Sequence, residues 1–517
     1  MKTENVIAAP QPAAPVADPW TTRRARLAVP LVPVAAALAL GLTGISGASF
    51  WIDEAATISI AQRPLGDMFR VFQEMDAVHG LYYLIMHVVI GLFGIGETAM
   101  RLPTVLVTAA AAGGVAVLGR RHANPRTGLL AGLFYAGGVT VMQYAQEARS
   151  YAFAAATAVL ASYLFVRGTE TRAVRWFAGY SVTIMLLGLL HLYALLLVPA
   201  HGITLYWRRQ ALRPVLGRWL LAVAVAVAAL IPYLLVVTGQ RVQVDWIPPE
   251  DASRLYSLVD FMAGNDRLVL PIGAIAGAGA LATVLARRGL DLPALAVPWA
   301  LAPVTILLLA GFVEPLLEAR YVVFSLPAVA LLAGAGLDWL GRQKAPLMAA
   351  ALVPIVMISL PSQVRIREQD SKLDDLRAAA QFVRERARPG DAVLYLDSAL
   401  RWDTAAYPDA YTGLRDITLA ASPQRTYTLT GTDVHVPALL RARLLQGNRV
   451  FVMKRHLAES SPEEIAMRRA AVDATGPYRE VAVLEYKGGR VRLLERLPRQ
   501  RPPAARRPVR PPVAPAP

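Results

Sequence analysis

Cysteine is absent from this chain of 517 residues, and charge and histidine are scarce. The absence of cysteine excludes disulfides, thiolate nucleophiles and cysteine-ligated zinc. Only 7 histidines are present, and they are scattered, so a histidine-based zinc site is not expected. Charged residues make up 17% of the chain, against about one quarter in ordinary soluble domains. These shortages argue against a single compact soluble enzyme.

What the chain has in excess is apolar character and positive charge. Hydrophobic residues make up 55% of it and the mean hydropathy is +0.41, which excludes a disordered chain and indicates an integral membrane protein with some soluble mass attached. The formal net charge is +16. Much of the excess arginine lies between apolar stretches and in a proline-rich tail, a pattern typical of cytoplasmic loops. No nucleic-acid partner is therefore expected.

Apolar stretches long enough to cross a bilayer recur as far as residue 361. A crossing helix needs about 20 such residues, and arginine clusters such as Arg120-Arg121 and Arg287-Arg288 place their loops in the cytoplasm with the N-terminus. The result is about eleven transmembrane helices, with the region after them outside. The predicted spans are residues 27–49, 100–119, 126–146, 151–167, 176–190, 192–207, 217–239, 268–286, 292–312, 321–341 and 345–361.

The topology depends on residues 176–207. Both ends of this segment are basic, so it must hold two short helices, with His191 near the turn between them. A single long helix would move every later element to the opposite side of the membrane.

Composition divides the chain into four parts, and the fold class is mainly α. Residues 1–26 are predicted to be a disordered cytoplasmic tail, and residues 27–361 a transmembrane domain whose outer loop is 50–99. Charged residues become frequent after about residue 362, and residues 362–497 are predicted to form a small extracytoplasmic α/β domain. Residues 498–517, rich in proline and arginine, are predicted to be disordered.

The pattern inside the C-terminal domain predicts both helix and strand. The expected elements are an amphipathic helix over 371–388, strands at 392–396 and 448–453, and a hairpin over 478–494 that turns at Gly488-Gly489.

The strongest local signal is a pair of carboxylates, Asp53 and Glu54, directly after the first span. Charge beside hydrocarbon is costly, so acids placed there usually have a function. A carboxylate at a partly dry membrane rim can act as a general base. The alternative is a solvated helix end with Trp51 as an interfacial anchor, and the local sequence favours neither.

A second signal lies where polar residues open an apolar, aromatic run. Asp76 and His79 could bind sugar hydroxyls or a cation, and Tyr82 could stack on a sugar ring. Taken alone, this pattern is more often an ordinary helix start.

Two further signals place arginine at the outer ends of spans. In Glu147-Ala148-Arg149, the arginine could contact a phosphate, although a plain salt bridge is favoured locally. The pair Arg320-Tyr321 opens a late span and suits a lipid phosphate, because arginine offers a rigid fork of donors and tyrosine an amphipathic surface. A membrane-interface anchor is an equally good interpretation of this pair.

The order of these signals is more informative than any one of them. In chain order they are Asp53-Glu54, His79-Gly80-Leu81-Tyr82-Tyr83, Glu147-x-Arg149-x-Tyr151, and Arg320-Tyr321 with Pro327 downstream. The series resembles the polytopic C-type (GT-C) membrane glycosyltransferases of the protein O-mannosyltransferase and aminoarabinose-transferase kind (glycosyltransferase family 39-like), and actinobacterial cell-envelope mannosyltransferases in particular. The resemblance covers about residues 30–340.

The resemblance implies an inverting transfer from a polyprenyl-phosphate sugar on the outer face of the membrane. Asp53 would be the general base that takes a proton from the acceptor hydroxyl, and Glu54 would orient the acceptor or the base. The donor phosphate would be held by Arg149, Arg320 and Tyr321, where fixed positive charge stabilises the leaving group.

The same resemblance assigns acceptor and sugar contacts to Asp76, His79, Tyr82, Glu147 and Tyr151. No cofactor follows with certainty. A divalent cation stays an alternative without a clear motif, because the second loop carries Glu147-x-Arg149 instead of Asp-x-Asp. The implied partners are the lipid-linked donor, membrane lipids and a cell-envelope acceptor that is a protein, lipoglycan or polysaccharide; the implied location is the plasma membrane.

The predicted function is thus a glycosyltransferase, with mannose the leading sugar, and two other classes stay open. A transporter or flippase of a lipid-linked saccharide would place ionisable groups near the bilayer midplane and show internal repeats, but here the acids lie at the outer ends of spans. A non-catalytic envelope scaffold is the third class, and the intact Asp53-Glu54 pair argues mildly against it.

Overall fold

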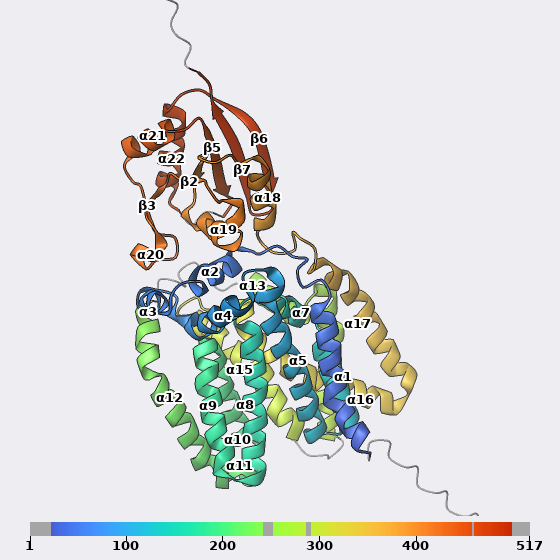
Figure 1. Ribbon diagram of the computed structural model, residues 1–517. Coiled ribbons are helices and arrows are strands. Elements are labelled where there is room, and N and C mark those ends of the chain that lie inside the picture. Colours follow the sequence, from blue (N-terminus) through green and yellow to red (C-terminus); the bar gives the residue numbers. More distant parts are fainter. Residues whose placement is uncertain (1–21, 241–251, 286–290, 458–459, 499–517) are drawn as a thin grey trace, which may run out of the picture. The chain divides into compact units, whose positions relative to one another are not determined.

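The computed structural model describes residues 22–240, 252–285, 291–457 and 460–498 (Figure 1). Most of both predicted disordered tails, and the predicted cytoplasmic loop at Arg287-Arg288, lie outside these residues. The chain divides into two compact units. The helical unit holds Met1–Ile45, Asp76–Tyr82 and Met100–Ile366, and the mixed unit holds Ser46–Met75, Tyr83–Ala99 and Arg367–Pro517.

The helical unit is a bundle of apolar helices. In the part of the chain described, eight helices are long and apolar enough to cross a membrane, and three shorter apolar helices lie at Ala77–Phe93, Val174–Leu190 and Leu192–Trp207. Each of the eleven predicted spans coincides with helical structure, which confirms the predicted polytopic, mainly α fold. The elements are α1 Arg23–Leu42, η1 Ala77–His79, α5 Glu97–His122, α6 Pro125–Gly137, α7 Val139–Ala145, α8 Tyr151–Thr171, α9 Val174–Leu190, η2 Leu192–Leu196, α10 Leu197–Trp207, α11 Arg209–Leu212, η3 Arg213–Val215, α12 Leu216–Gly239, α13 Ala252–Ala263, α14 Asp266–Leu285, α15 Asp291–Gly311, η5 Ala319–Ser325, α16 Leu326–Gln343 and α17 Ala345–Arg365.

Two of the predicted spans differ from the structure: one ends early and one is interrupted. The first was expected to reach residue 49, but α1 ends at Leu42, and the chain turns at Gly44, whose φ of 66° favours glycine. The span 126–146 is broken between α6 and α7 at Gly138, which is extended.

Residues 176–207 form two helices, as the basic ends of this segment predict. Helix α9 ends at Leu190, and His191 is extended, with φ −162° and ψ 104°. Tyr180 of α9 and His201 of α10 are hydrogen-bonded at 3.0 Å, so the two helices fold back on each other as a hairpin.

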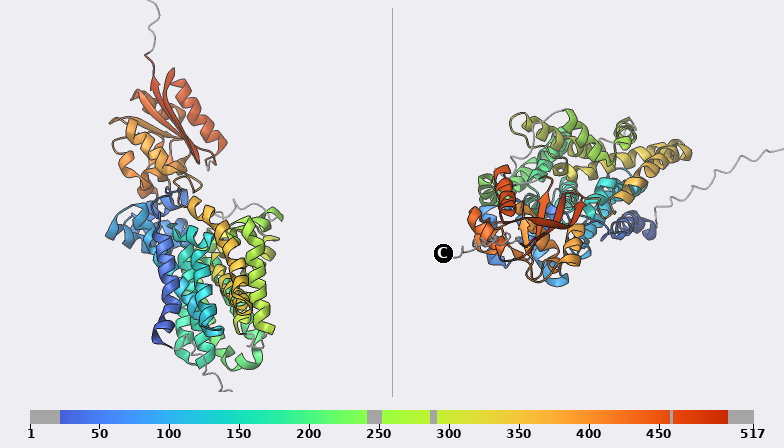
Figure 2. Two further views of the ribbon diagram at one scale, coloured as in Figure 1. Left: turned by 90° about the vertical axis from the view of Figure 1, so that its right-hand side faces the viewer. Right: turned by 90° about the horizontal axis from the view of Figure 1, so that it is seen from above.

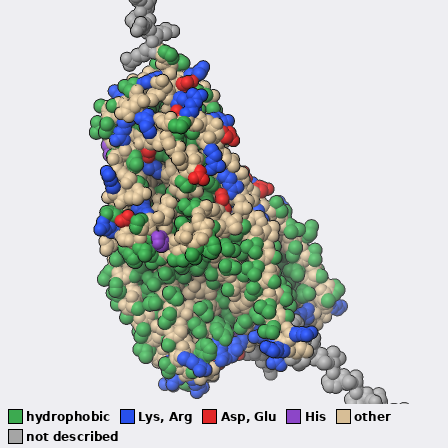
Figure 3. Space-filling model, in the orientation of Figure 1, with side chains coloured by type: hydrophobic (Ala, Val, Ile, Leu, Met, Phe, Trp, Pro, Cys, Tyr) green, Lys and Arg blue, Asp and Glu red, His purple; other side chains and the backbone are tan. Residues whose placement is uncertain are grey.

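The surface of the helical unit is that of a membrane protein. On the face that Figure 3 shows, most side chains of this unit are hydrophobic, and Lys and Arg gather at its lower end. Some helices carry largely exposed apolar residues, such as Leu235 on α12 (71% exposed) and Leu270 on α14 (83%). In water these faces would be unfavourable, whereas hydrocarbon solvates them well.

Glycines set the closest helix contact of the bundle. A Cβ atom added at Gly279 of α14 would lie 2.0 Å from the carbonyl oxygen of Leu332 in α16, and one at Gly336 of α16 would lie 2.1 Å from that of Ile275. The two backbones therefore touch, as small residues allow in membrane helices.

The mixed unit contains a five-stranded sheet in the order β2-β1-β5-β7-β6, with helices on both faces (Figure 2). Strand β1 pairs in parallel with β2 and β5, and β7 pairs antiparallel with β5 and β6. A two-stranded sheet, β3 with β4, lies beside it. The strands are β1 Ala392–Tyr395, β2 Arg415–Asp416, β3 Leu419–Ala421, β4 Thr432–Asp433, β5 Arg449–Arg455, β6 Tyr478–Tyr486 and β7 Gly489–Arg496. The predicted α/β character of this region is confirmed.

Side chains alternate between the two faces of the sheet, and each face has its own hydrophobic core. Val393 and Tyr395 of β1 face one cluster with Phe382 of α18, whereas Ala392 and Leu394 face another with helices α21 and α22. The helices of this unit are α2 Ile52–Ala61, α3 Leu65–Glu74, most of α4 Gly80–Phe93, α18 Leu376–Arg386, η6 Ser398–Leu400, α19 Arg401–Ala406, η7 Pro408–Ala410, α20 Pro423–Thr426, α21 Pro437–Leu445 and α22 Pro462–Ala474.

The amphipathic helix predicted from residue 371 begins five residues later. Asp375 caps it, because its carboxylate accepts a hydrogen bond of 3.1 Å from the Ala378 backbone N–H. The predicted hairpin turns at Lys487-Gly488, and Gly488 has a φ of 98°.

Candidate active site

Polar and aromatic side chains from four junctions meet within the helical unit, at the ends of helices opposite the arginine-rich end. The junctions are η1 before α4, the turn between α7 and α8, the break between α9 and η2, and η5 before α16. Together they supply a set that we call the polar cluster: His79, Arg149, Tyr151, His191, Tyr193, Arg320 and Tyr321.

The contact between His79 and Arg149 fixes the state of the histidine. Nη2 of Arg149 lies 2.9 Å from Nε2 of His79. A guanidinium can only donate, so Nε2 must accept, and the ring is neutral with its proton on Nδ1. The preceding Asp76 adopts a left-handed backbone with φ 56°, a conformation in which aspartate is one of the better-tolerated residues.

Aromatic rings line the cluster in a continuous series. The rings of Tyr151 and His191 have centroids 5.5 Å apart, and those of His191 and Tyr321 are 5.7 Å apart in an edge-to-face contact. Tyr193 and Tyr321 stack at 4.8 Å. Such a wall suits a sugar ring, because aromatic faces pack on its C–H groups while the phenol hydroxyls offer hydrogen bonds.

Two arginines bring positive charge to the same place. Both Arg149 and Arg320 act electrostatically on His79 and on His191. Burial and the charge of Arg149 lower the pKa of His191 to about 4, so this imidazole is neutral near pH 7. The carboxylates of Glu147 and Glu318 lie near the same rings, since both act electrostatically on Tyr144. The forked donors of the two arginines match a phosphate in shape.

The structure brings together five residues that the sequence predicted for the site. They are His79, Arg149, Tyr151, Arg320 and Tyr321. Tyr82 is 1% exposed, and its ring packs edge-on against Phe153 at 5.7 Å. Glu147 is buried, and its backbone carbonyl accepts a 2.8 Å hydrogen bond from the Arg149 N–H.

The sequence analysis did not assign His191 or Tyr193 to the site. The signal was nevertheless present, because His191 lies at the predicted break between two spans, at the same predicted side as the other site residues. Within the described ranges, no group of three or more His, Asp or Glu side chains lies at metal-binding spacing.

Asp53 and Glu54 belong to the mixed unit. They occupy the first turn of α2, where the helix dipole favours negative charge. Glu54 is fully buried, whereas Asp53 is partly exposed. The Asp374 carboxylate accepts a hydrogen bond from the backbone N–H of Ile52, the first residue of α2.

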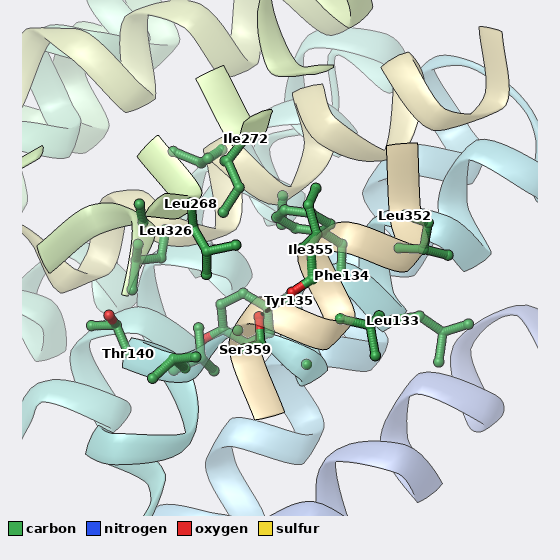
Figure 4. A pocket seen from close by; sticks show the side chains of 18 of the residues that line it. Leu133, Phe134, Tyr135, Thr140, Leu268, Ile272, Leu326, Leu352, Ile355 and Ser359 are labelled. Carbon is green, nitrogen blue, oxygen red and sulfur yellow. Dashed lines mark hydrogen bonds between the residues drawn. The ribbon is translucent and has the colours of Figure 1, made fainter. Parts of the chain in front are cut away.

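An apolar cavity of about 340 Å³ lies in the helical unit (Figure 4). Leucine, isoleucine and valine side chains dominate its wall, together with Phe134 and a few polar groups such as Thr140 and Ser359. Two of its walls continue into segments of the polar cluster. Helix α7 lines it before reaching Tyr144, which contacts Tyr151 at 5.0 Å, and Leu326 lines it directly after η5.

Comparison with protein families matches residues 80–236 to the family described as dolichyl-phosphate-mannose-protein mannosyltransferase. The matched range includes Arg149, Tyr151 and His191, and ends before Arg320. Comparison with curated proteins finds no match.

Several solved structures are similar to this chain in fold. ArnT from Cupriavidus metallidurans in the apo state is similar with a TM-score of 0.58 at 15% identity, over 91% of this chain and 98% of that chain. The same enzyme bound to undecaprenyl phosphate gives a TM-score of 0.54 at 15% identity, over 90% and 97%. Arabinofuranosyltransferase AftD from Mycobacteria gives 0.50 at 14% identity, over 92% of this chain and 40% of that one. The match over residues 80–236 and the shared fold bear out the predicted resemblance: the chain is a polytopic membrane protein with the fold of the C-type (GT-C) glycosyltransferases.

Proposed function

We propose that the protein is an inverting glycosyltransferase that moves a sugar from a polyprenyl-phosphate donor to a hydroxyl of a cell-envelope acceptor. Mannose is the expected sugar, the acceptor is a protein, lipoglycan or polysaccharide, and the reaction takes place on the outer face of the plasma membrane. The observation that carries the proposal is the polar cluster with its two arginines, built on the same segments as an apolar cavity.

This pairing suits an amphiphilic donor. A polyprenyl-phosphate sugar has a charged phosphate, a polar ring and a long hydrocarbon chain. Arg149 and Arg320 offer forked donors for the phosphate, and the tyrosines a surface for the ring. The cavity offers apolar walls for part of the chain, and the helix α7 joins the two environments.

The comparisons support the same donor class. The family that matches residues 80–236 is described by its use of dolichyl-phosphate mannose, and ArnT has been solved with undecaprenyl phosphate bound. Both are lipids that join a polyprenyl chain to a phosphate. We extend this donor class to the present chain on the strength of its cluster.

In the proposed reaction, the acceptor oxygen attacks the anomeric carbon in a single displacement. The bond from this carbon to the acceptor oxygen forms, the bond to the phosphate oxygen breaks, and the configuration inverts. Asp53 takes the proton of the acceptor hydroxyl. Arg320 and Arg149 stabilise the charge that the departing lipid phosphate gains, with Tyr321 beside them.

The remaining predicted residues have supporting parts in this scheme. His79 orients Arg149, because its Nε2 is already engaged by the guanidinium. Tyr151 faces the sugar from the aromatic wall. We assign Glu54 to the orientation of the base, and Asp76, Tyr82 and Glu147 to the shaping of the acceptor and sugar site.

A transfer assay tests the function directly. Purified protein is mixed with a panel of radiolabelled polyprenyl-phosphate sugars and native membrane acceptors, with wild type and Asp53→Asn side by side. We expect transfer from one donor and a loss of about 10²–10⁴-fold in the variant, the usual worth of a general base. Asp67→Asn, in the first turn of α3, serves as the matched carboxylate control.

Each result has a distinct meaning. If Asp53→Asn still transfers sugar, the protein is a glycosyltransferase but Asp53 is not its general base. Binding of donor lipids without transfer from any of them would contradict the proposal and favour the transporter or scaffold.

A further inference from the structure

Arg377, at the start of α18, holds the segment that leads into α2. Its guanidinium donates to three successive backbone carbonyls, those of Ser46 at 2.8 Å, Gly47 at 3.0 Å and Ala48 at 3.0 Å. Its backbone N–H donates to the hydroxyl of Ser49 at 2.9 Å. One residue of the C-terminal region thus satisfies the polar groups of four consecutive residues that form neither helix nor strand.

Glu97 and Tyr407 complete this contact. The Glu97 carboxylate accepts from the Arg377 guanidinium at 2.8 Å and from the Tyr407 hydroxyl at 2.8 Å. The Tyr407 oxygen in turn accepts from the Phe50 backbone N–H at 3.1 Å, and the two rings lie 5.7 Å apart. The side chain of Arg377 is 21% exposed and that of Glu97 is 16% exposed, so water competes little for this pair.

The contacts continue up to the helix itself. The Ser49 N–H donates to the Gln369 carbonyl at 2.9 Å, and the Ile52 N–H donates to the Asp374 carboxylate. Residues 46–52 are therefore fixed, almost residue by residue, by residues 369–377 and Tyr407. Asp53 is the next residue along the chain.

The far end of α2 is held as well. Arg63 is 2% exposed and lies two residues after Ala61, the last residue of α2. It donates to the carbonyl of Thr428 at 2.7 Å and to that of Ser59 at 3.1 Å. On α3, the Arg70 guanidinium lies over the Tyr427 ring at 4.8 Å. Both ends of the helix that carries Asp53 thus depend on the C-terminal region.

We infer that Arg377 is a positioning residue for Asp53, and that the C-terminal domain works in the reaction by holding α2 in place instead of by supplying a catalytic group. The inference rests on the proposed function, in which Asp53 is the base. A base that shifts by about 1 Å can lose on the order of 10²-fold in rate, although its own chemistry is intact. Without Arg377, three carbonyls and the Glu97 carboxylate each lose a donor.

The experiment compares four full-length variants with wild type. Arg377→Ala removes the contact, Arg377→Lys keeps the charge but not the fork, and Tyr407→Phe removes a single hydroxyl. Arg384→Ala is the matched control, because Arg384 is an exposed arginine on the same helix. Two quantities are measured: kcat and KM for transfer, and the backbone hydrogen–deuterium exchange of residues 46–60 without substrate.

We expect Arg377→Ala to lower kcat by about 10–100-fold, with KM for the donor changed by less than about 3-fold, and to speed exchange over residues 46–52. Arg377→Lys should recover part of both effects, Tyr407→Phe should show a smaller change, and Arg384→Ala should match wild type. An unchanged exchange rate in Arg377→Ala, or a loss of kcat without faster exchange, would overturn the inference.

The two readouts separate this inference from the proposed function. If wild type transfers no sugar, exchange alone still shows whether Arg377 holds the segment, and only the proposed function fails. Another outcome is that Asp53→Asn retains transfer while Arg377→Ala speeds exchange over residues 46–52. In that case Arg377 holds the segment, but Asp53 is not the base that it positions, and the positioning role is overturned.

Discussion

At the scale of the residue, arginine and lysine carry the same charge but offer different hydrogen-bond geometry, and Arg320 of the polar cluster is a place to test that difference. Arg320 belongs to a group of side chains whose aromatic members, Tyr321 and His191, are already packed against each other. In such a place, the planar fork of arginine can make two parallel hydrogen bonds to a phosphate, whereas a lysine ammonium binds as a point charge.

Arg320→Lys should therefore lower kcat/KM for the lipid donor by about 10–100-fold, a cost of roughly 1.4–2.7 kcal/mol. The control is Arg342→Lys, which changes the same residue type at the other end of α16, where Arg342 contacts Asp338 at 3.0 Å. Steady-state kinetics with the donor identified in the transfer assay measure both. Equal values for Arg320→Lys and wild type would argue against phosphate binding at this residue.

Asp403 in α19 is a buried carboxyl in the mixed unit, 1% exposed. Burial, followed by the charge of Asp374, raises the pKa of Asp403 well above its usual range. The folded state thus binds this proton more tightly than the unfolded chain, whose aspartates titrate near pH 4. Stability must fall as pH rises from about 4 through the folded pKa, and the loss persists above it.

Asp403→Asn removes this titration. We expect the variant to be more stable than wild type at pH 8 by about 1–2 kcal/mol, and to gain little near pH 4. Thermal unfolding at several pH values measures the difference. Asp409→Asn, a substitution of an exposed aspartate nearby, should show no such trend. A constant difference between Asp403→Asn and wild type across pH would contradict the assignment.

At the scale of elements, α14 and α16 illustrate how a membrane bundle packs. Glycines at residues 273, 277 and 279 of α14 look equivalent in the sequence, yet a Cβ atom would meet nothing within 4 Å at Gly273 or Gly277. At Gly279, it would lie 2.0 Å from the Leu332 carbonyl oxygen and 2.6 Å from the Gly336 nitrogen. Backbone atoms cannot give way as a side chain can.

Gly279→Leu should force the two helices apart and cost at least about 1–3 kcal/mol, the usual range for overpacking. Gly277→Leu, half a turn away on the same helix, should be tolerated. Thermal unfolding in detergent and the yield of monodisperse protein compare the two variants. Similar stability of both would show that the α14–α16 contact is not as close as described.

The elements also show what a sequence can and cannot predict. Transmembrane spans can be predicted from the sequence because a helix needs about 20 apolar residues to cross the bilayer. The break at His191 could be predicted because both ends of its segment are basic. The arginines of the polar cluster were found because they open or close predicted spans. His191 and Tyr193 were not assigned to the site, because their role comes from neighbours on other junctions, which no local pattern records.

The role of the C-terminal region was the least predictable part. Its helix and strands follow from hydrophobic periodicity, and most were found. Its contact with the segment before α2 joins Arg377 to Ser46, which are 331 residues apart in the chain. No spacing rule links such residues. The segment after α1 is also apolar enough that residues 43–49 were assigned to the first span.

For the whole molecule, the mixed unit is discontinuous in the chain, and this has a consequence for synthesis. The segment from Ser46 is made early, whereas Arg377 follows 331 residues later. At about 5–20 residues per second, the ribosome needs roughly 15–65 s for this stretch. During that time α2 cannot reach its final packing. Newly made chains therefore pass through a state in which the segment before Asp53 lacks its contacts with Arg377. We expect this interval to be the period in which chaperones or proteases on that side of the membrane meet the protein.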